Sequence, residues 1–426
     1  MGLLVLAIAF FVLLILKVPI FVVIGLSSLL YVLLSDIPSV LLAQRMTTQL
    51  ASFSLLAIPF YILLAEVLNA GSASRRLIAF VNSIVGFIKG GLGIANVGIS
   101  MLFAGISGTA VADTSGLGKT LIPAMKKEGY PGSYAAAVTG ASSVVGPIIP
   151  PSVNLIIAGV TAGISIQQLF LAGFIPGMLM GLAMGITAYL IALKRKFPRS
   201  NKFEFKNVWK AFLNSIWELF LIGLVLYGIM GGLFTPTEAG AIGVIGAMFL
   251  GFIIRRDVSL KQFYKACVES VMFSGTVLIL VGFAATYGWI LASEGVPTMM
   301  TESILSITVV PILAMLLVML VLFVVGAVME TIASLVIVLP TLLVLGEAIG
   351  VEPIQMTLLV VINLTLGLLT PPIGVGLFIV TSISKESMSS IIKEMIPFFL
   401  ANTAVLILVI VFPSLTMWLP EILGGR

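Results

Sequence analysis

Apolar segments follow one another along this chain from end to end. Windows of 15 to 25 mostly apolar residues recur across all 426 positions, and each can cross, or nearly cross, a hydrocarbon core of about 30 Å. Only 9% of the residues are charged, whereas a soluble domain carries about 25%. Lipid cannot satisfy backbone polar groups, so such a chain must form helices. We therefore predict an all-α polytopic membrane protein.

The residues that are absent or rare exclude several functions. The chain has no histidine, which removes the commonest general base and metal ligand, and its single Cys267 cannot form an intrachain disulfide. The net charge of +5 does not indicate nucleic-acid binding, because the basic residues lie in loops, where membrane topology explains them. Without a nucleophile–base pair, we do not expect an enzyme.

The basic residues predict the topology. The stretch KRKFPRSNKFEFKNVWK (194–210) holds seven Lys or Arg against one Glu, so we expect a cytoplasmic linker over 194–212. Counting crossings outward from this linker places nearly all other basic residues on the same side, with Arg45 and Arg426 outside. Both termini are then periplasmic. The first 35 residues lack the pattern of a cleaved signal peptide, so we expect them to be retained.

Two helices are interrupted in the same way. The chain reads SVVGPIIPPS at 143–152 and, 221 positions later, LTLGLLTPPI at 364–373. Proline removes a backbone donor and disrupts a helix interior. At this offset, several structure-breaking residues of the two halves coincide: Gly105, Gly146, Pro150 and Pro151 align with Gly326, Gly367, Pro371 and Pro372. Corresponding interrupted segments in inverted halves are typical of secondary transporters with a binding site near the midplane.

Each half also contains a candidate re-entrant hairpin. In the first half, two short apolar stretches flank the tip GISGTAVAD (105–113), and by charge both Lys89 and Lys126 belong on the cytoplasmic side. The second hairpin turns at GAVMETIAS (326–334) and should enter from outside. Irregular backbone at this depth must be buried in protein or line a wet cavity.

The expected organisation is an inverted structural repeat. The first repeat, 1–193, comprises scaffold helices 1–70, arm helix 72–90, hairpin 92–125, broken helix 133–162 and helix 168–193. The second, 213–426, comprises scaffold helices 213–292, arm helix 295–306, hairpin 308–347, broken helix 354–381 and helix 391–413.

The two tips and the two breaks should meet around one site. Unwound carbonyls and tip hydroxyls are hard oxygen ligands suited to a small cation. We expect Na⁺ ligands from two sets, one comprising Ser107, Gly146, Ile149 and Pro151, the other Gly326, Glu330, Gly367, Thr370 and Ile373. Half-helix N-termini favour an anionic substrate group, for which the candidate residues are Ser107, Thr109, Asp113, Glu330 and Thr331. The two acids could instead bond exposed helix ends, and Ser107 and Thr109 could cap a half-helix.

These motifs resemble a known family. The GxSGTAVAD tip, the GPIIPPS and TPPIG breaks and the segment FTPTEAGA (234–241) together resemble the large membrane subunit of tripartite ATP-independent periplasmic (TRAP) transporters, over essentially the whole chain. Related sodium/divalent-anion symporters carry Ser-Asn-Thr at both tips. Here the tips read Ser107-Gly108-Thr109 and Met329-Glu330-Thr331, which favours the TRAP group.

The resemblance implies a mechanism and partners. It implies sodium-driven import, with at least two Na⁺ ions, by an elevator in which a mobile domain slides against a scaffold in the bacterial inner membrane. A periplasmic binding protein would deliver an organic acid, such as a sialic acid or a C4-dicarboxylate. A small four-helix membrane subunit would extend the scaffold, and we expect it as a separate chain. The alternatives are a stand-alone sodium/anion symporter and an ion channel.

Overall fold

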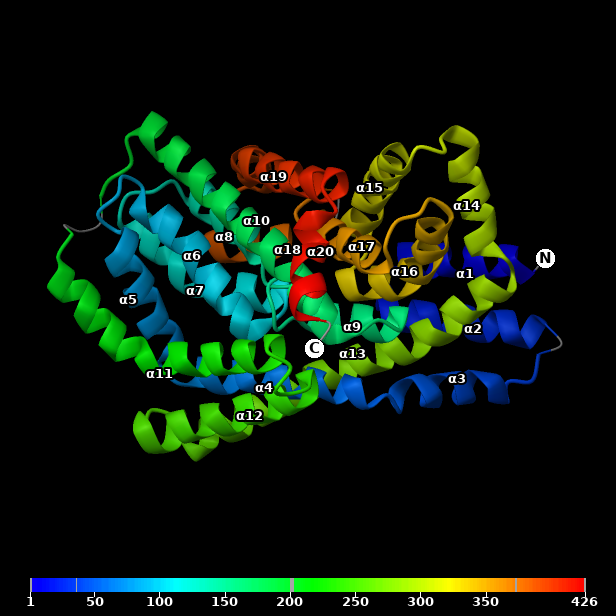
Figure 1. The fold of residues 1–426 in the computed structure, drawn as a ribbon, viewed down its shortest axis with the longest axis horizontal. Coiled ribbons are helices and arrows are strands. Elements are labelled where there is room, and N and C mark those ends of the chain that lie inside the picture. Colours follow the sequence, from blue (N-terminus) through cyan, green and yellow to red (C-terminus); the bar gives the residue numbers. More distant parts are fainter. Residues whose placement is uncertain (1, 36, 200–202, 372–373, 425–426) are drawn as a thin grey trace.

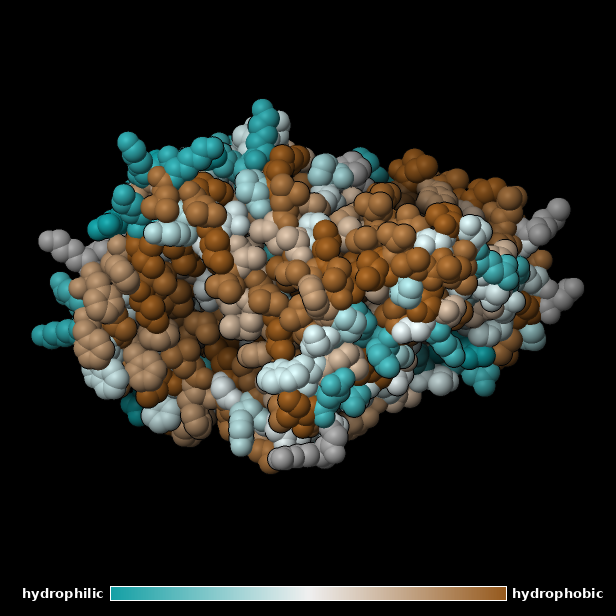
Figure 2. Space-filling view, turned by 45° about the horizontal axis from the view of Figure 1, so that its top comes forward, coloured by the Kyte–Doolittle hydropathy of each residue, from teal (hydrophilic) through white to brown (hydrophobic). Residues whose placement is uncertain are grey.

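The prediction of an all-helical membrane protein is confirmed. A computed structural model describes residues 2–35, 37–199, 203–371 and 374–424, and this part of the chain contains helices and no strand. Eight of its helical segments are long and apolar enough to cross a membrane. Figure 2 shows a mostly hydrophobic surface, with hydrophilic side chains gathered at its upper left and in a band at its lower right.

One group of helices packs together around α4 and α13, and we refer to it as the scaffold. α4 packs against α12 and α13, and α13 also contacts α2 and α3. Figure 1 shows α3, α4, α12 and α13 along the lower edge of the molecule. The scaffold elements are α1 (Gly2–Ile15), α2 (Ile20–Leu34), α3 (Val40–Leu50), the 3₁₀ turn η1 (Phe53–Leu56), α4 (Ala57–Ala70), α11 (Phe205–Met230), α12 (Pro236–Phe249), the π-helical turn η2 (Leu250–Ile254) and α13 (Leu260–Ser293).

The hairpins and interrupted helices form a second, interlocked group. α7 packs against α8 and α18, while α16 packs against α17 and α9, so each second half-helix contacts the hairpin of the other half of the chain. In Figure 1, α6 to α8 lie above the scaffold on the left and α15 to α17 on the right. The elements are α6 (Gly91–Ser107), α7 (Ala110–Lys127), α8 (Gly132–Ser143), α9 (Val153–Ala162), α15 (Pro311–Val328), α16 (Thr331–Ala348), α17 (Pro353–Gly367) and α18 (Val375–Ser384).

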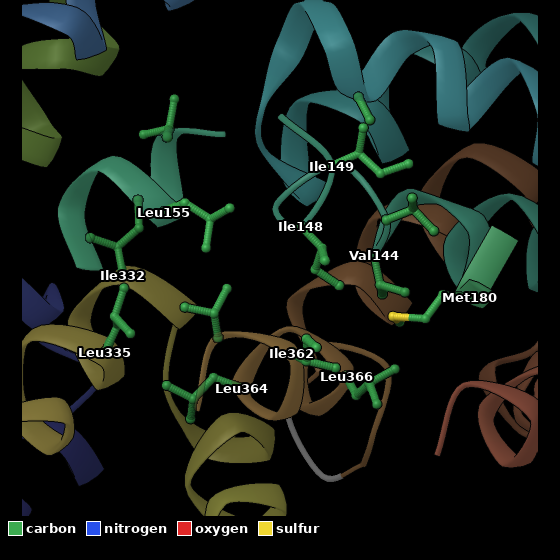
Figure 3. Close-up of a cluster of buried hydrophobic side chains, with 14 of the residues drawn as sticks. Val144, Ile148, Ile149, Leu155, Met180, Ile332, Leu335, Ile362, Leu364 and Leu366 are labelled. Atoms are coloured by element: carbon green, nitrogen blue, oxygen red, sulfur yellow. The ribbon is translucent and has the colours of Figure 1, made fainter. Parts of the chain in front are cut away.

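Buried side chains from both halves hold this group together. Figure 3 shows Leu155 of α9 beside Ile332 and Leu335 of α16, and Val144 and Ile148 of the first interruption facing α17 and Met180. All of these side chains are buried, most of them completely. Close van der Waals packing, and not transfer out of water, holds helices together in a membrane, so these contacts keep the broken segments in place although they lack helical hydrogen bonds.

The remaining helices connect and cover the two groups. α10 packs against α6, α9, α19 and α20, and α5 contacts both α6 and α11. The structure contains two helices, α3 and α20, that the sequence did not predict. The connecting and covering helices are α5 (Ala73–Val85), α10 (Ile166–Arg195), α14 (Val296–Ile307), α19 (Met388–Val411) and α20 (Ser414–Leu423).

A buried charge network anchors the start of α5 to the scaffold. Glu218 of α11 is fully buried, and its two carboxylate oxygens accept from Arg76 Nη1 at 2.8 Å and from Arg255 Nη2 at 3.0 Å. Arg76 Nη2 also lies 2.9 Å from Asp257 Oδ2, and this carboxylate accepts from Ser72 as well. Removing one partner of a buried pair costs about 3–5 kcal/mol, so these contacts hold α5, α11 and the loop before α13 together.

Candidate functional site

The hairpin tips and the scaffold enclose a central cavity of about 240 Å³. One wall comes from α2 and α13, and the opposite wall from the two tips and the two helix interruptions. The scaffold supplies Ile20, Phe21, Phe273, Thr276, Val277 and Leu280; the facing wall comprises Thr109, Ala110, Val111, Pro147, Asn154, Glu330, Thr331, Ile332, Leu368 and Val375. The structure therefore brings segments from both halves of the chain to one place.

Four helices of the hairpin group begin at this cavity, and so does the scaffold helix α2. The first residues of α7, α9, α16 and α18 all contribute to its wall. A helix N-terminus carries unsatisfied N–H groups and roughly half a positive charge. The N-termini of α7, α9 and α18 create a favourable site for an anion in this mainly apolar cavity, whereas the N-terminus of α16 is already capped by the Glu330 carboxylate.

The first tip is a sharp turn between α6 and α7. Gly108 has φ +63°, a conformation that glycine adopts without strain, and its carbonyl accepts a backbone hydrogen bond from Val153 N at 3.2 Å. Thr109 caps α7, accepting from Ala112 N at 3.3 Å, and the Ser107 hydroxyl donates to Thr109 O, also at 3.3 Å. The tip is thus bonded to the residue where α9 begins.

Asp113 lies behind this tip, in the first turn of α7. Its side chain is buried, and neither carboxylate oxygen has a hydrogen-bond partner among the described residues. The carboxylate lies directly against Gly146, so closely that a Cβ there would collide with Asp113 Oδ2. An unpartnered buried carboxylate is costly, which makes this a place where a cation would be stabilised.

The second tip uses its acid differently. Glu330 is the N-cap of α16, and its Oε2 accepts from Ile332 N at 2.9 Å and from Ala333 N at 3.2 Å. The next residue, Thr331, is buried in the cavity wall, and its hydroxyl has no partner within the described ranges. The Glu330 carboxylate therefore stabilises a helix end, while the Thr331 hydroxyl is available to a ligand.

Glycines bring the second hairpin into backbone contact with α17. A Cβ on Gly326 would lie 3.0 Å from Gly367 Cα, so neither position has room for a side chain. Gly374 N donates to Ala327 O at 3.2 Å, and Thr370 Oγ1 donates to Gly367 O at 2.7 Å. Gly374 and Val153 occupy equivalent positions at the offset of 221, and both tie a second half-helix to a hairpin tip.

The candidate residues fall into three places. Thr109, Glu330 and Thr331 line the central cavity, whereas Ser107, Asp113, Gly146 and Pro151 lie behind the first tip, where Pro151 O approaches Gly108. Gly326, Gly367 and Thr370 lie behind the second tip. Ile149 is buried against Gly177, and Ile373 lies outside the described residues.

Sequence reasoning missed other residues of the cavity wall. Asn154 directly follows the first break and is buried, and a polar residue at that position was a usable signal. The scaffold residues Phe273, Thr276 and Leu280 carried no such signal, because they belong to the long apolar helix α13.

Comparisons with known proteins identify the family. The family model described as "Tripartite ATP-independent periplasmic transporter, DctM component" matches residues 7–415. The chain is 35% identical, over 90% of both chains, to the sialic acid TRAP transporter large permease protein SiaM of Vibrio cholerae. It is 33% identical to the 2,3-diketo-L-gulonate TRAP transporter large permease protein YiaN of Escherichia coli, covering 88% of both chains.

Two further comparisons agree. The chain is 33% identical to the C4-dicarboxylate TRAP transporter large permease protein DctM of Vibrio cholerae, over 96% of this chain and 95% of that one. Its fold resembles the crystal structure of the Alcanivorax borkumensis YdaH transporter, with a TM-score of 0.61, 14% identity and coverage of 88% and 87%. These relatives are named as permeases or transporters and not as enzymes, and this chain belongs to the DctM family of large membrane components of TRAP transporters.

Proposed function

We propose that this chain is the large membrane subunit of a sodium-driven, binding-protein-dependent transporter that imports an organic acid. The observation that carries the proposal is the central cavity, where the N-termini of α7, α9 and α18 face apolar scaffold helices. Such termini stabilise the carboxylate of a substrate, and the apolar walls accommodate the rest of a small molecule. The Thr331 hydroxyl and the Asn154 side chain would orient the substrate.

The relatives support an organic-acid substrate. Those named for their substrates transport sialic acid, 2,3-diketo-L-gulonate and C4-dicarboxylates, which are carboxylic acids, and isethionate, which is a sulfonic acid. The shared chemistry is an organic anion, which matches the helix N-termini. A sialic acid and a C4-dicarboxylate are the two substrates to test first.

We place one Na⁺ behind the first tip. The Asp113 carboxylate, the Ser107 hydroxyl and the freed carbonyls near Gly146 and Pro151 supply oxygen ligands there, and the charge of Asp113 has no partner among the described residues. A second Na⁺ would bind near Gly326, Gly367 and Thr370 behind the second tip. Each ion would stabilise the contact between a hairpin tip and a broken helix, and so prepare the cavity for the anion.

The grouping of the helices supports an elevator motion. The hairpins and broken helices interlock across the two halves, so they can move as one body against α2 and α13. The cavity lies between these two groups, which means that such a movement would carry a bound substrate with the tips. Arm helices α5 and α14 and the cytoplasmic linker would connect the moving body to the scaffold.

The family also supports the partners and the location. We propose a separate four-helix membrane subunit that extends the scaffold, a periplasmic protein that delivers the substrate, and the bacterial inner membrane as the site of action, with both termini in the periplasm. The direction of the positive-inside asymmetry agrees with this orientation.

Reconstitution tests the proposal. Proteoliposomes that contain this chain, the small subunit and the binding protein should accumulate the acid only with an inward Na⁺ gradient and without ATP. Equal uptake with a K⁺ gradient would refute sodium coupling. Equally fast uptake by the chain alone would favour a stand-alone symporter, and single-channel currents across a planar bilayer would favour an ion channel.

A further inference from the structure

A second groove lies away from the central cavity, between arm helix α5, hairpin helix α6 and α10. Its volume is about 570 Å³, and its walls are apolar side chains and glycines apart from Tyr189 at one end. It follows α10 from Phe174 to Tyr189, which is roughly 22 Å at 1.5 Å per residue. One leaflet contributes about half of the ~30 Å hydrocarbon core, so the groove can hold an extended acyl chain.

Glycines line this groove, and one of them, Gly185, leaves part of it open. Gly98 of α6 and Gly181 and Gly185 of α10 line it and contribute no side chains. A Cβ built on Gly185 would meet no atom within 4 Å, so the space beside this residue is open. The exposed apolar side chains of Met178, Leu182 and Ile186 border the groove, and they would otherwise face lipid.

One end of the groove is basic. A further pocket of about 540 Å³ shares Ile94 and Tyr189 with the groove and is also lined by Lys89 and Arg199. Both cationic side chains are exposed, and neither forms a salt bridge with any residue that the structure describes. The long apolar groove therefore adjoins a basic pocket whose cations have no salt-bridge partner in the described structure. Tyr189 lies at the boundary between the groove and the pocket.

We propose that this groove and its basic end bind one anionic phospholipid. The acyl chain would lie along α10 between α5 and α6, and the phosphate would lie between Lys89 and Arg199. Basic pockets between membrane helices attract anionic headgroups, and a tyrosine suits the boundary between headgroups and hydrocarbon. A soluble anion would use only the basic end, and an apolar helix of a partner protein would need neither cation.

Native mass spectrometry of the full-length purified chain can test this site. We expect phosphatidylglycerol to bind about 25-fold more tightly than phosphatidylcholine with the same acyl chains, because each of the two basic residues adds about fivefold for an anionic lipid. Glycerol 3-phosphate, which is the headgroup without acyl chains, should show no retained binding. Equal affinities for the two lipids, or equal binding of glycerol 3-phosphate, would overturn the proposal.

Two sets of variants separate the charged end from the groove. Lys89→Gln with Arg199→Gln should abolish the preference for phosphatidylglycerol, while Lys127→Gln with Lys261→Gln removes the same charge elsewhere and should preserve it. Gly185→Leu should weaken the binding of both lipids about tenfold, because the leucine side chain fills the open space in the groove. Gly223→Leu is its control, since a Cβ there also meets no atom within 4 Å.

Photo-crosslinking locates the acyl chain. Phosphatidylglycerol with a photoreactive group on one acyl chain should label peptides of α6 and α10 in the wild type, and labelling should fall in Gly185→Leu but not in Gly223→Leu. Labelling confined to other helices, or unchanged labelling in Gly185→Leu, would show that the lipid does not occupy this groove.

Discussion

The two hairpin tips contain the same class of residue in two different roles. At the first tip a threonine caps α7, and the acid, Asp113, lies in the first turn of this helix without a hydrogen-bond partner in the described structure. At the second tip the acid itself, Glu330, caps α16 with two hydrogen bonds. An acidic residue near a membrane hairpin tip can therefore serve either as a structural cap or as a buried carboxyl group that is available to a ligand. We consider the second kind the better candidate for ion coupling.

Removing the charge of Asp113 should have the largest effect. Asp113→Asn keeps the shape and removes the negative charge that we assign to Na⁺, and losing one partner of a buried charge pair costs about 3–5 kcal/mol. We expect the Na⁺ concentration for half-maximal uptake in proteoliposomes to rise about a hundredfold. Glu330→Asn, which retains a good N-cap residue, should change this Na⁺ concentration by less than about threefold. Equal losses in both variants would mean that the two acids share one role.

Adding a methyl group at the two helix breaks should separate stability from ion binding. Gly367→Ala forces a side chain into the backbone of Gly326, so we expect about 2 kcal/mol of destabilisation and a lower melting temperature. The Cβ added in Gly146→Ala meets mainly the Asp113 carboxylate. This variant should therefore change the Na⁺ response, which is the Na⁺ concentration for half-maximal uptake, more than it changes the melting temperature.

Gly116→Ala on α7 is the control for both, because a Cβ there meets no atom within 4 Å. Its melting temperature should not fall. If Gly146→Ala lowered the melting temperature as much as Gly367→Ala and left the Na⁺ response unchanged, the first break would be a packing contact and not part of a Na⁺ site.

The caps themselves should give the smallest effect. Glu330→Ala removes the acceptor for two backbone N–H groups of α16 and should lower stability by about 1 kcal/mol, whereas Glu330→Ser should restore most of it. Thr109→Ala and Thr109→Ser form the matching pair at the first tip. Thermal unfolding of the purified chain measures all four variants. If serine at 330 were no better than alanine, the Glu330 carboxylate would be stabilising something other than the helix end.

Local signals made the framework of the site predictable. Glycine and proline act on their own backbone, so the breaks at 144–152 and after Gly367 could be placed from sequence, as could the turns at the two tips. The inverted repeat and the entry of each hairpin from its own side of the membrane remain predictions.

The role of each acid could not be predicted in the same way. Whether Asp113 or Glu330 finds a backbone donor depends on its exact position relative to a helix start, and a shift of a few residues changes the outcome. The residues that line the scaffold side of the cavity could not be predicted either, because Phe273 and Leu280 resemble any other apolar residue of a membrane helix. Which apolar residues line the cavity depends on how distant segments pack together, and no local sequence pattern predicts this packing.

The contacts of α5 differ between its two ends. Arg76 fixes the first turn of α5 to α11 and to Asp257 through charged hydrogen bonds, whereas the later turns of α5 meet α6 through the apolar side chains of Val81 and Val85. The base of the arm is therefore held more firmly than its end. If the hairpin group moves as we propose, we expect the displacement to be taken up beyond Val85, in the segment GFIKGG, where three of the six residues are glycines.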